Sequence, residues 1–151
     1  MRVPTPTAPL TRRPGLLVVL AVTLLCASCT RSDRLAVHPV HGRVLFEGHP
    51  ATEALVIFHP QAAGEEWALI RPSARVGPDG SFTLTTYDAG DGAPAGDYAV
   101  TIDWREHTAP VEGAPPGRSL LPPRYASPQT SPLHAQVKPG ANELEPFKLT
   151  R

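Results

Sequence analysis

Cysteine is scarce in this chain: the 151 residues contain only Cys26 and Cys29, both near the N-terminus. A network of disulfides, which stabilises many small exported domains, is therefore excluded for everything after residue 29. Helical patterning is also missing, because no long window beyond residue 30 repeats its apolar residues at the spacing of an α-helix. The chain must fold through strands and a hydrophobic core, and the length after residue 29 is sufficient for one such domain.

Sequence motifs for catalysis or for metal binding are absent as well. The six histidines are scattered, with no HExxH motif or cysteine pair beside them, and His38 and His41 would face opposite sides of a strand. The serines lack the Gly-Xaa-Ser-Xaa-Gly pattern of a nucleophile elbow. We therefore expect no cofactor, no zinc site and no hydrolase triad.

Charge of one sign is not in excess, because 14 basic side chains balance 14 acidic ones. Arg2, Arg12 and Arg13 precede residue 29, so the remainder of the chain is mildly acidic. A chain without a basic stripe lacks the electrostatic footprint that binding to phosphate backbones requires. Nucleic acid is therefore not expected as a partner.

The N-terminal segment does contain an arginine pair followed by an apolar run at residues 16–25. This run is typical of the core of a signal peptide and is shorter than the roughly 20 residues that span a bilayer. The end of the segment, with Ala27 and Ser28 before Cys29, resembles a bacterial lipobox, although Cys26 stands where leucine is usual. The resemblance implies cleavage before Cys29 and acylation of its thiol.

Two alternatives to lipidation remain at this site. Ordinary secretion would cleave after Ala27 or Ser28 and leave Cys29 as a free thiol, and a disulfide would join Cys26 to Cys29. With lipidation, residues 1–28 form the signal peptide, 29–36 a polar tether and 37–151 a single exported domain. That domain is expected in the cell envelope, held to the periplasmic or surface face of a bacterial membrane by its lipid anchor.

The exported part alternates apolar and polar residues with a period of two, which is typical of strands. Turn signals, of which Gly77-Pro78-Asp79-Gly80 is the strongest, separate the alternating segments. The pattern predicts seven short strands, at residues 40–47, 53–59, 67–76, 81–86, 97–104, 133–137 and 144–149. We therefore expect an all-β, seven-stranded antiparallel β-sandwich, with a closed barrel as the alternative.

Finer expectations follow from single residues. Residues 97–104 carry one unbroken apolar row of Tyr98, Val100, Ile102 and Trp104, which must face the core. Pro72 breaks the third strand and places it at an edge, and the parity of the last strand slips near residues 145–146, which predicts a bulge. The proline-rich insert at residues 107–132 is too long for an ordinary connection and is expected to be functional or mobile.

An ordered set of segments resembles the carboxypeptidase regulatory-like domain, in the version found in exported lipoproteins of planctomycete-type bacteria. The segments are PVHGRV at 39–44, GHPA at 48–51, VIFHP at 56–60, PDGSFTLTTY at 78–87, GDGAPAGDYAVTI at 90–102, LPPRY at 121–125 and TSPL at 130–133. The resemblance implies a transthyretin-like, or prealbumin-like, seven-stranded sandwich and accessory, adhesive or carbohydrate-associated roles. It implies no reaction, because the family name refers to a noncatalytic domain attached to some peptidases.

Aromatic residues supply the candidate ligand-binding positions. Exposed Trp67 or Tyr125 would offer an apolar platform on which a sugar ring can stack. The alternatives are simple packing for Trp67, and for Tyr125 a role as the anchor of a segment that wraps the sandwich.

Aspartates in a glycine-rich connection supply the candidate metal ligands. Asp88, Asp91 and Asp97 can provide the carboxylate oxygens that calcium prefers, although their spacing fits no EF-hand loop. Turn formation, with solvated or capping aspartates, is the favoured alternative.

These observations predict a non-enzymatic, membrane-anchored exported lipoprotein whose β-sandwich serves binding, adhesion or structure. Its partners would be the membrane and a glycan or an envelope protein. A carbohydrate-binding module on the cell surface is the alternative. A hydrolase of the 5-hydroxyisourate type, which shares the transthyretin-like architecture, is less favoured because residues 147–151 lack the tail of those enzymes.

Overall fold

The computed structural model describes residues 34–62, 64, 67, 69–107 and 117–151. The expected signal peptide, Cys29 and most of the tether lie outside the described residues. Residues 35–151 form one compact unit, so the folded domain begins two residues before the boundary at residue 37 that the sequence suggests.

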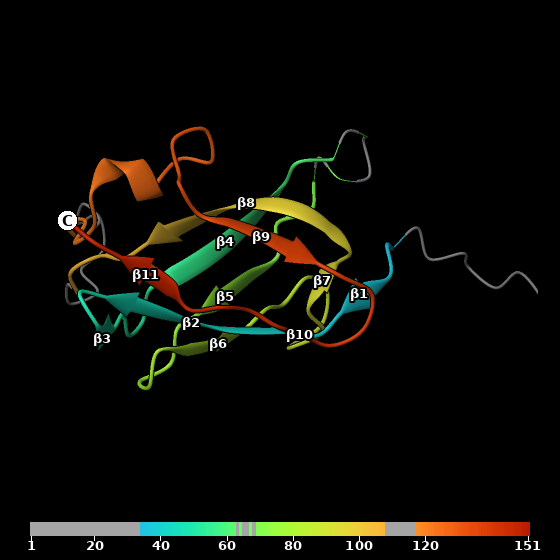
Figure 1. Cartoon of the computed structure of the whole chain (residues 1–151), viewed down its shortest axis with the longest axis horizontal. Helices are drawn as coiled ribbons and strands as arrows, with labels where there is room; N and C mark the ends of the chain where they lie inside the picture. The colour runs from blue at the N-terminus through green and yellow to red at the C-terminus, as the bar shows by residue number, and fades with distance from the viewer. Residues whose placement is uncertain (1–33, 63, 65–66, 68, 108–116) are drawn as a thin grey trace, which may run out of the picture. The chain divides into compact units, whose positions relative to one another are not determined.

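The described residues are organised in three sheets (Figure 1). In the first, β2 (Val40–Phe46) pairs with β3 (His49–Pro50), β6 (Ser81–Thr83), β10 (Asn142–Glu143) and β11 (Phe147–Leu149). The second has the order β5 (Ser73–Arg75), β4 (Leu55–Pro60), β8 (Gly96–Asp103), β9 (His134–Val137). The third is the short pair β1 (Val37–His38) and β7 (Ala93–Pro94). The named elements of the described chain are strands and one short 3₁₀ turn, so the all-β prediction is confirmed.

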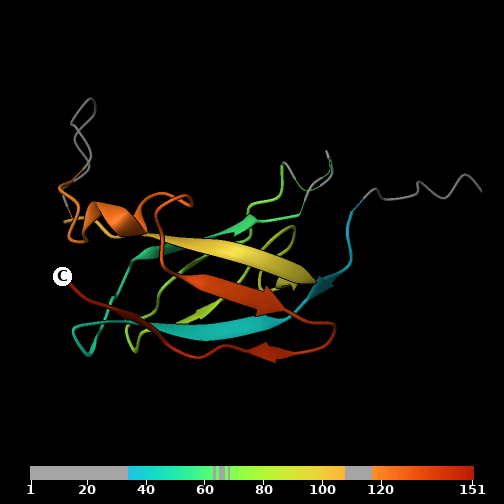
Figure 2. The ribbon, with the colours of Figure 1, turned by 45° about the horizontal axis from the view of Figure 1, so that its top comes forward.

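The core lies between the two larger sheets, which occupy separate layers in Figure 2. Rings from both layers meet there: Phe58 of β4 packs edge-on against Phe147 of β11, with ring centroids 6.3 Å apart. The largest fully buried side chains are Tyr98, Phe58, Leu84, Ile102, Leu149, Val40, Val44, Val56, Val76, Val100, Pro72 and Pro94. This arrangement is sandwich-like, and apolar burial across it is the main stabilising contribution.

Strand β2 shows how the alternating sequence becomes a layer. Val40 and Val44 are fully buried while His41 and Arg43 are exposed. Gly42 lies in the buried row and pairs with Phe82 of β6, whose ring occupies the space where a side chain at position 42 would stand. The two-residue turn that follows, Glu47-Gly48, has positive φ at both positions, as a tight hairpin into β3 requires.

Strand β8 confirms the predicted apolar row. Tyr98, Val100 and Ile102 are at most 1% exposed, and Trp104 packs at the margin of the core with its indole N–H donating to the Thr52 carbonyl oxygen at 2.8 Å. The opposite row is more buried than its polarity suggests, since Thr101 is 4% exposed. The physical reason is that β4 pairs along nearly the whole of β8, so neighbouring side chains cover the small residues on this face.

The pairing of the last strands corrects the expectation of a purely antiparallel sandwich. Strands β10 and β11 run parallel to β2, because the chain crosses over from β9 in the other layer before it returns beside its own first long strand. The predicted bulge is confirmed by the register. Asn142 faces Val40 but Phe147 faces Val44, so one extra residue lies between β10 and β11, at the break that contains Pro146.

The third predicted strand is much shorter than residues 67–76. Only Ser73–Arg75 pairs with β4, and the chain before it turns, with the Ile70 amide donating to the Trp67 carbonyl oxygen. Pro72 has no amide to donate, although its carbonyl oxygen accepts from Phe58. The strand lies at the edge of its sheet, as predicted. An isolated bridge between Ser73 and Thr85 then joins this edge to the chain that follows β6.

The described part of the proline-rich insert follows the edge of β8 that β9 leaves uncovered. Arg105 and Ser119 form an antiparallel bridge, and further along the Ser131 hydroxyl donates to the Val100 carbonyl oxygen. Between them lies one turn of 3₁₀ helix, η2 (Pro123–Tyr125), which contacts β8. Residues 117–132 are therefore an ordered covering of the sheet edge rather than a protruding loop.

Candidate functional site

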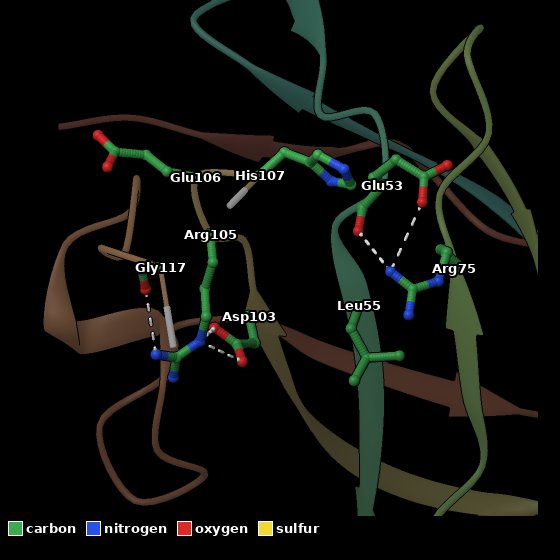
Figure 3. A pocket seen from close by; sticks show the side chains of 8 residues that line it. All are labelled: Glu53, Leu55, Arg75, Asp103, Arg105, Glu106, His107 and Gly117. Carbon is green, nitrogen blue, oxygen red and sulfur yellow. Dashed lines mark hydrogen bonds and ion pairs between the residues drawn. The ribbon is translucent and has the colours of Figure 1, made fainter. Parts of the chain in front are cut away.

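A charged hollow of about 360 Å³ opens where β4 begins and where β5 and β8 end (Figure 3). Strand register builds it, because Leu55 of β4 faces Arg75 of β5 on one side and Asp103 of β8 on the other. The chain after β8 and the returning insert complete the wall. The lining residues of this charged hollow are Glu53, Leu55, Arg75, Asp103, Arg105, Glu106, His107 and Gly117.

Two ion pairs flank Leu55 in the charged hollow (Figure 3). Arg75 lies 3.6 Å from the Glu53 carboxylate and donates to the Glu53 carbonyl oxygen at 3.2 Å. The Arg105 Nε lies 2.9 Å from both carboxylate oxygens of Asp103, and its guanidinium reaches the Gly117 carbonyl oxygen at 3.4 Å. All four charged side chains are more than 40% exposed, so these pairs exchange readily with water and with a polar ligand.

The chemistry that this hollow offers is hydrogen bonding and ion pairing around a small apolar floor. In Figure 3 His107 points toward Glu53, whereas the Glu106 side chain points away from both ion pairs. Serine and cysteine nucleophiles are absent from its described lining. This set of donors and acceptors suits a polar or charged ligand better than an apolar one.

Tyr125 is buried, with 3% of its surface exposed. Its hydroxyl accepts from the Thr150 amide at 3.1 Å, and the neighbouring Arg124 donates to the Thr150 carbonyl oxygen at 2.6 Å. Because the ring has no exposed face on which a sugar could stack, its placement favours the anchor interpretation over ligand binding. The segment around η2 is fastened here to the end of the chain.

Trp67 is partly buried and packs against the core. Its ring lies over Gly96 and 6.5 Å from the Tyr98 ring, centroid to centroid. Neither Trp67 nor Tyr125 lines the charged hollow, so the structure does not bring the two predicted aromatic positions together with it.

Asp91 organises a turn instead of presenting its carboxylate outward. The two oxygens accept hydrogen bonds from the amides of Thr86, Tyr87 and Asp88 at 2.7, 3.0 and 2.9 Å. Partial burial would raise the pKa of Asp91, but these hydrogen bonds outweigh it and lower the pKa.

Asp97 lies on β8 and accepts from the Gln136 amide of β9 at 3.0 Å, apart from the Asp91 turn. Across the described ranges, no group of three His, Cys, Asp or Glu side chains converges in the way that a metal site requires. The contacts of Asp91 fit the turn interpretation, whereas Asp97 pairs across neighbouring strands.

Sequence reasoning missed His59, which pairs with Ala99 of β8 and whose ring reaches the nearby Thr101. Its Nε2 lies 2.8 Å from the Thr101 hydroxyl. Burial lowers the pKa of His59, and the positive charge of Arg71 lowers it further. The charged hollow was missed as well, although the signal for it is present: Arg75, Arg105 and their acidic neighbours cluster next to predicted strand ends.

Residues 34–62, 64, 67, 69–107 and 117–151 include no helix long and apolar enough to cross a membrane. Comparison with models of protein families, with curated proteins and with solved structures found no match to this chain.

Proposed function

We propose that this protein is a non-enzymatic exported lipoprotein, anchored to a bacterial membrane at Cys29, whose β-sandwich binds a ligand or partner in the cell envelope. The observation that carries the proposal is the succession of an arginine pair, a short apolar run, and Ala27-Ser28-Cys29 directly before a folded domain that begins at Leu35. The five residues between Cys29 and Leu35 allow a separation of at most about 20 Å between anchor and domain.

The resemblance to carboxypeptidase regulatory-like domains extends this proposal to the fold. We assign the domain a transthyretin-like topology, which is supported by the two facing sheets and by the ordered segments that carry the resemblance. The exposed ion pairs of the charged hollow support a binding role, because they offer recognition groups without a positioned nucleophile.

Intact-mass analysis of the protein purified from membranes of its native host tests the anchor. The expected result is a mature chain that begins at acylated Cys29 and fractionates with membranes. Cys29→Ala is expected to abolish both properties, whereas the matched variant Cys26→Ala is expected to retain them. An unmodified soluble chain that begins after Ala27 or Ser28 would refute the lipoprotein proposal.

A further inference from the structure

A second hollow of about 530 Å³ lies beside the charged hollow, and Glu106 lines both. It is formed where the chain returns from the proline-rich insert next to the end of the chain after β11. We name it the arginine hollow; its lining residues are Glu106, Arg118, Ser119, Leu120, Leu121, Pro122 and Arg151.

The backbones that carry its two arginines are fixed. The Arg118 carbonyl oxygen accepts from the Glu106 amide at 2.9 Å, next to the bridge between Arg105 and Ser119. The Arg151 amide donates to the Glu47 carboxylate at 3.0 Å, and Arg124 donates to the Arg151 carbonyl oxygen at 2.9 Å. The segment around Arg118 and the end of the chain at Arg151 are thus held in place by backbone contacts. A ligand that binds both arginines therefore loses less conformational entropy of the protein on binding.

The guanidinium groups of Arg118 and Arg151 differ from those of the other arginines nearby. Arg75 and Arg105 are paired with carboxylates, and Arg124 is occupied by the Thr150 and Arg151 carbonyl oxygens. For Arg118 and Arg151, no described residue provides a hydrogen bond or ion pair to the side chain. Glu106 is the only acidic side chain in the described lining of this hollow, so guanidinium groups outnumber side-chain carboxylates there.

We propose that the arginine hollow binds the carboxylate groups of an acidic polysaccharide, an inference that rests on the proposed exported binding function. Guanidinium groups bind carboxylates through two parallel hydrogen bonds and are weakly hydrated. Leu120, which is 39% exposed, and Pro122 add an apolar surface beside them. A uronic acid matches both features, because its ring presents a carboxylate together with an apolar C–H face.

Titration of the full-length protein in detergent micelles with oligogalacturonate, followed by calorimetry, tests this assignment. We expect saturable binding that weakens as salt is added, since the contacts are exposed charges. Arg118→Ala and Arg151→Ala are each expected to weaken binding about tenfold, the loss of one charge-assisted contact. Arg43→Ala is the matched control and is expected to bind as the wild type does. Arg43 lies on β2, pairs with Asp79 and does not line this hollow.

Three outcomes would overturn the assignment: unchanged binding by the folded Arg118→Ala/Arg151→Ala double variant, equal binding of methyl-esterified oligogalacturonate, or equal binding of poly-glutamate. Thermal unfolding of each variant verifies that it is folded. Mass analysis at Cys29 is independent of this titration, so an acylated protein without affinity for oligogalacturonate would refute the ligand and leave the anchor intact.

Discussion

The two ends of the sandwich use their polar groups in opposite ways. At the end with β1 and β7, the Asp91 carboxylate accepts three backbone amides, and the Thr86 hydroxyl donates to the Gly92 carbonyl oxygen. At the end with the C-terminus (Figure 1), the guanidinium groups of Arg118 and Arg151 make no such contact within the described chain. Asp91 and Thr86 at the first end serve the fold, whereas Arg118 and Arg151 at the second end remain available to a ligand.

Substitution of Asp91 should therefore affect stability, whereas substitution of Arg118 or Arg151 should affect binding. A group that satisfies buried backbone amides cannot be removed without leaving those amides unpaired. A group that contacts only water costs little to remove. The predictions below probe this contrast, in order of decreasing effect on the free energy of unfolding.

Gly92→Ala is expected to have the largest effect. Gly92 has φ of +96°, and a Cβ at this position would collide with the backbone carbonyl oxygen of His38. Strain and displacement of β1 together are expected to lower the free energy of unfolding by about 3 kcal/mol or more. Gly48→Ala is the control, because Gly48 also has positive φ but no atom lies within 4 Å of the point that an alanine Cβ would occupy there; a loss of about 1 kcal/mol is expected. Equal losses in urea unfolding would contradict the proposed collision.

Asp91→Ala is expected to cost about 2 kcal/mol at neutral pH, because three backbone amides lose their acceptor. The lowered pKa of Asp91 also sets the pH dependence. Its contribution is fully present above the unfolded-state pKa of about 3.9 and is lost as pH falls through the lower folded-state pKa. The difference in unfolding free energy between wild type and variant should therefore shrink as pH falls below about 4. A difference that is independent of pH would refute this role.

Tyr125→Phe probes the second end and is expected to cost about 1 kcal/mol. The variant keeps the buried ring but loses the hydroxyl that accepts from the Thr150 amide. Chemical denaturation measures the loss, and faster hydrogen exchange at the Thr150 amide would localise it. Unchanged exchange at this amide would show that the contact does not hold the end of the chain.

The Arg118→Ala/Arg151→Ala double variant is expected to change the free energy of unfolding by no more than about 0.5 kcal/mol, as for surface side chains without partners. Denaturation at low and at high salt measures it. A loss of several kcal/mol would remove the contrast between the two ends and would assign these arginines to the fold.

The strands and the special positions within them were predictable to different degrees. The rows of β2 and β8, the edge position of Ser73–Arg75 and the bulge near Pro146 follow from local alternation and from the missing amide of proline. The parallel return of the last strands beside β2 was not predictable in this way, because alternation fixes which side a residue faces but not which strand becomes its neighbour.

The candidate site residues also differ in how far the sequence could predict them. Trp67 and Tyr125 stand out by residue type, yet packing places Trp67 over Gly96 and buries Tyr125 against the end of the chain. Arg118 and Arg151 have no distinguishing pattern in the sequence around them. What sets them apart is that no described carboxylate pairs with them, and this depends on the tertiary structure.

An all-β domain after a short apolar N-terminal run is written into the local sequence, because strand periodicity, turn residues and hydrophobic runs are local properties of the chain. The position of Leu55 between two ion pairs, and the placement of Arg118 and Arg151 in one hollow, arise from the folded chain. The physical reason is that the partner of a strand, or of a charged side chain, is often distant in sequence. Such residues become neighbours only when the backbone folds.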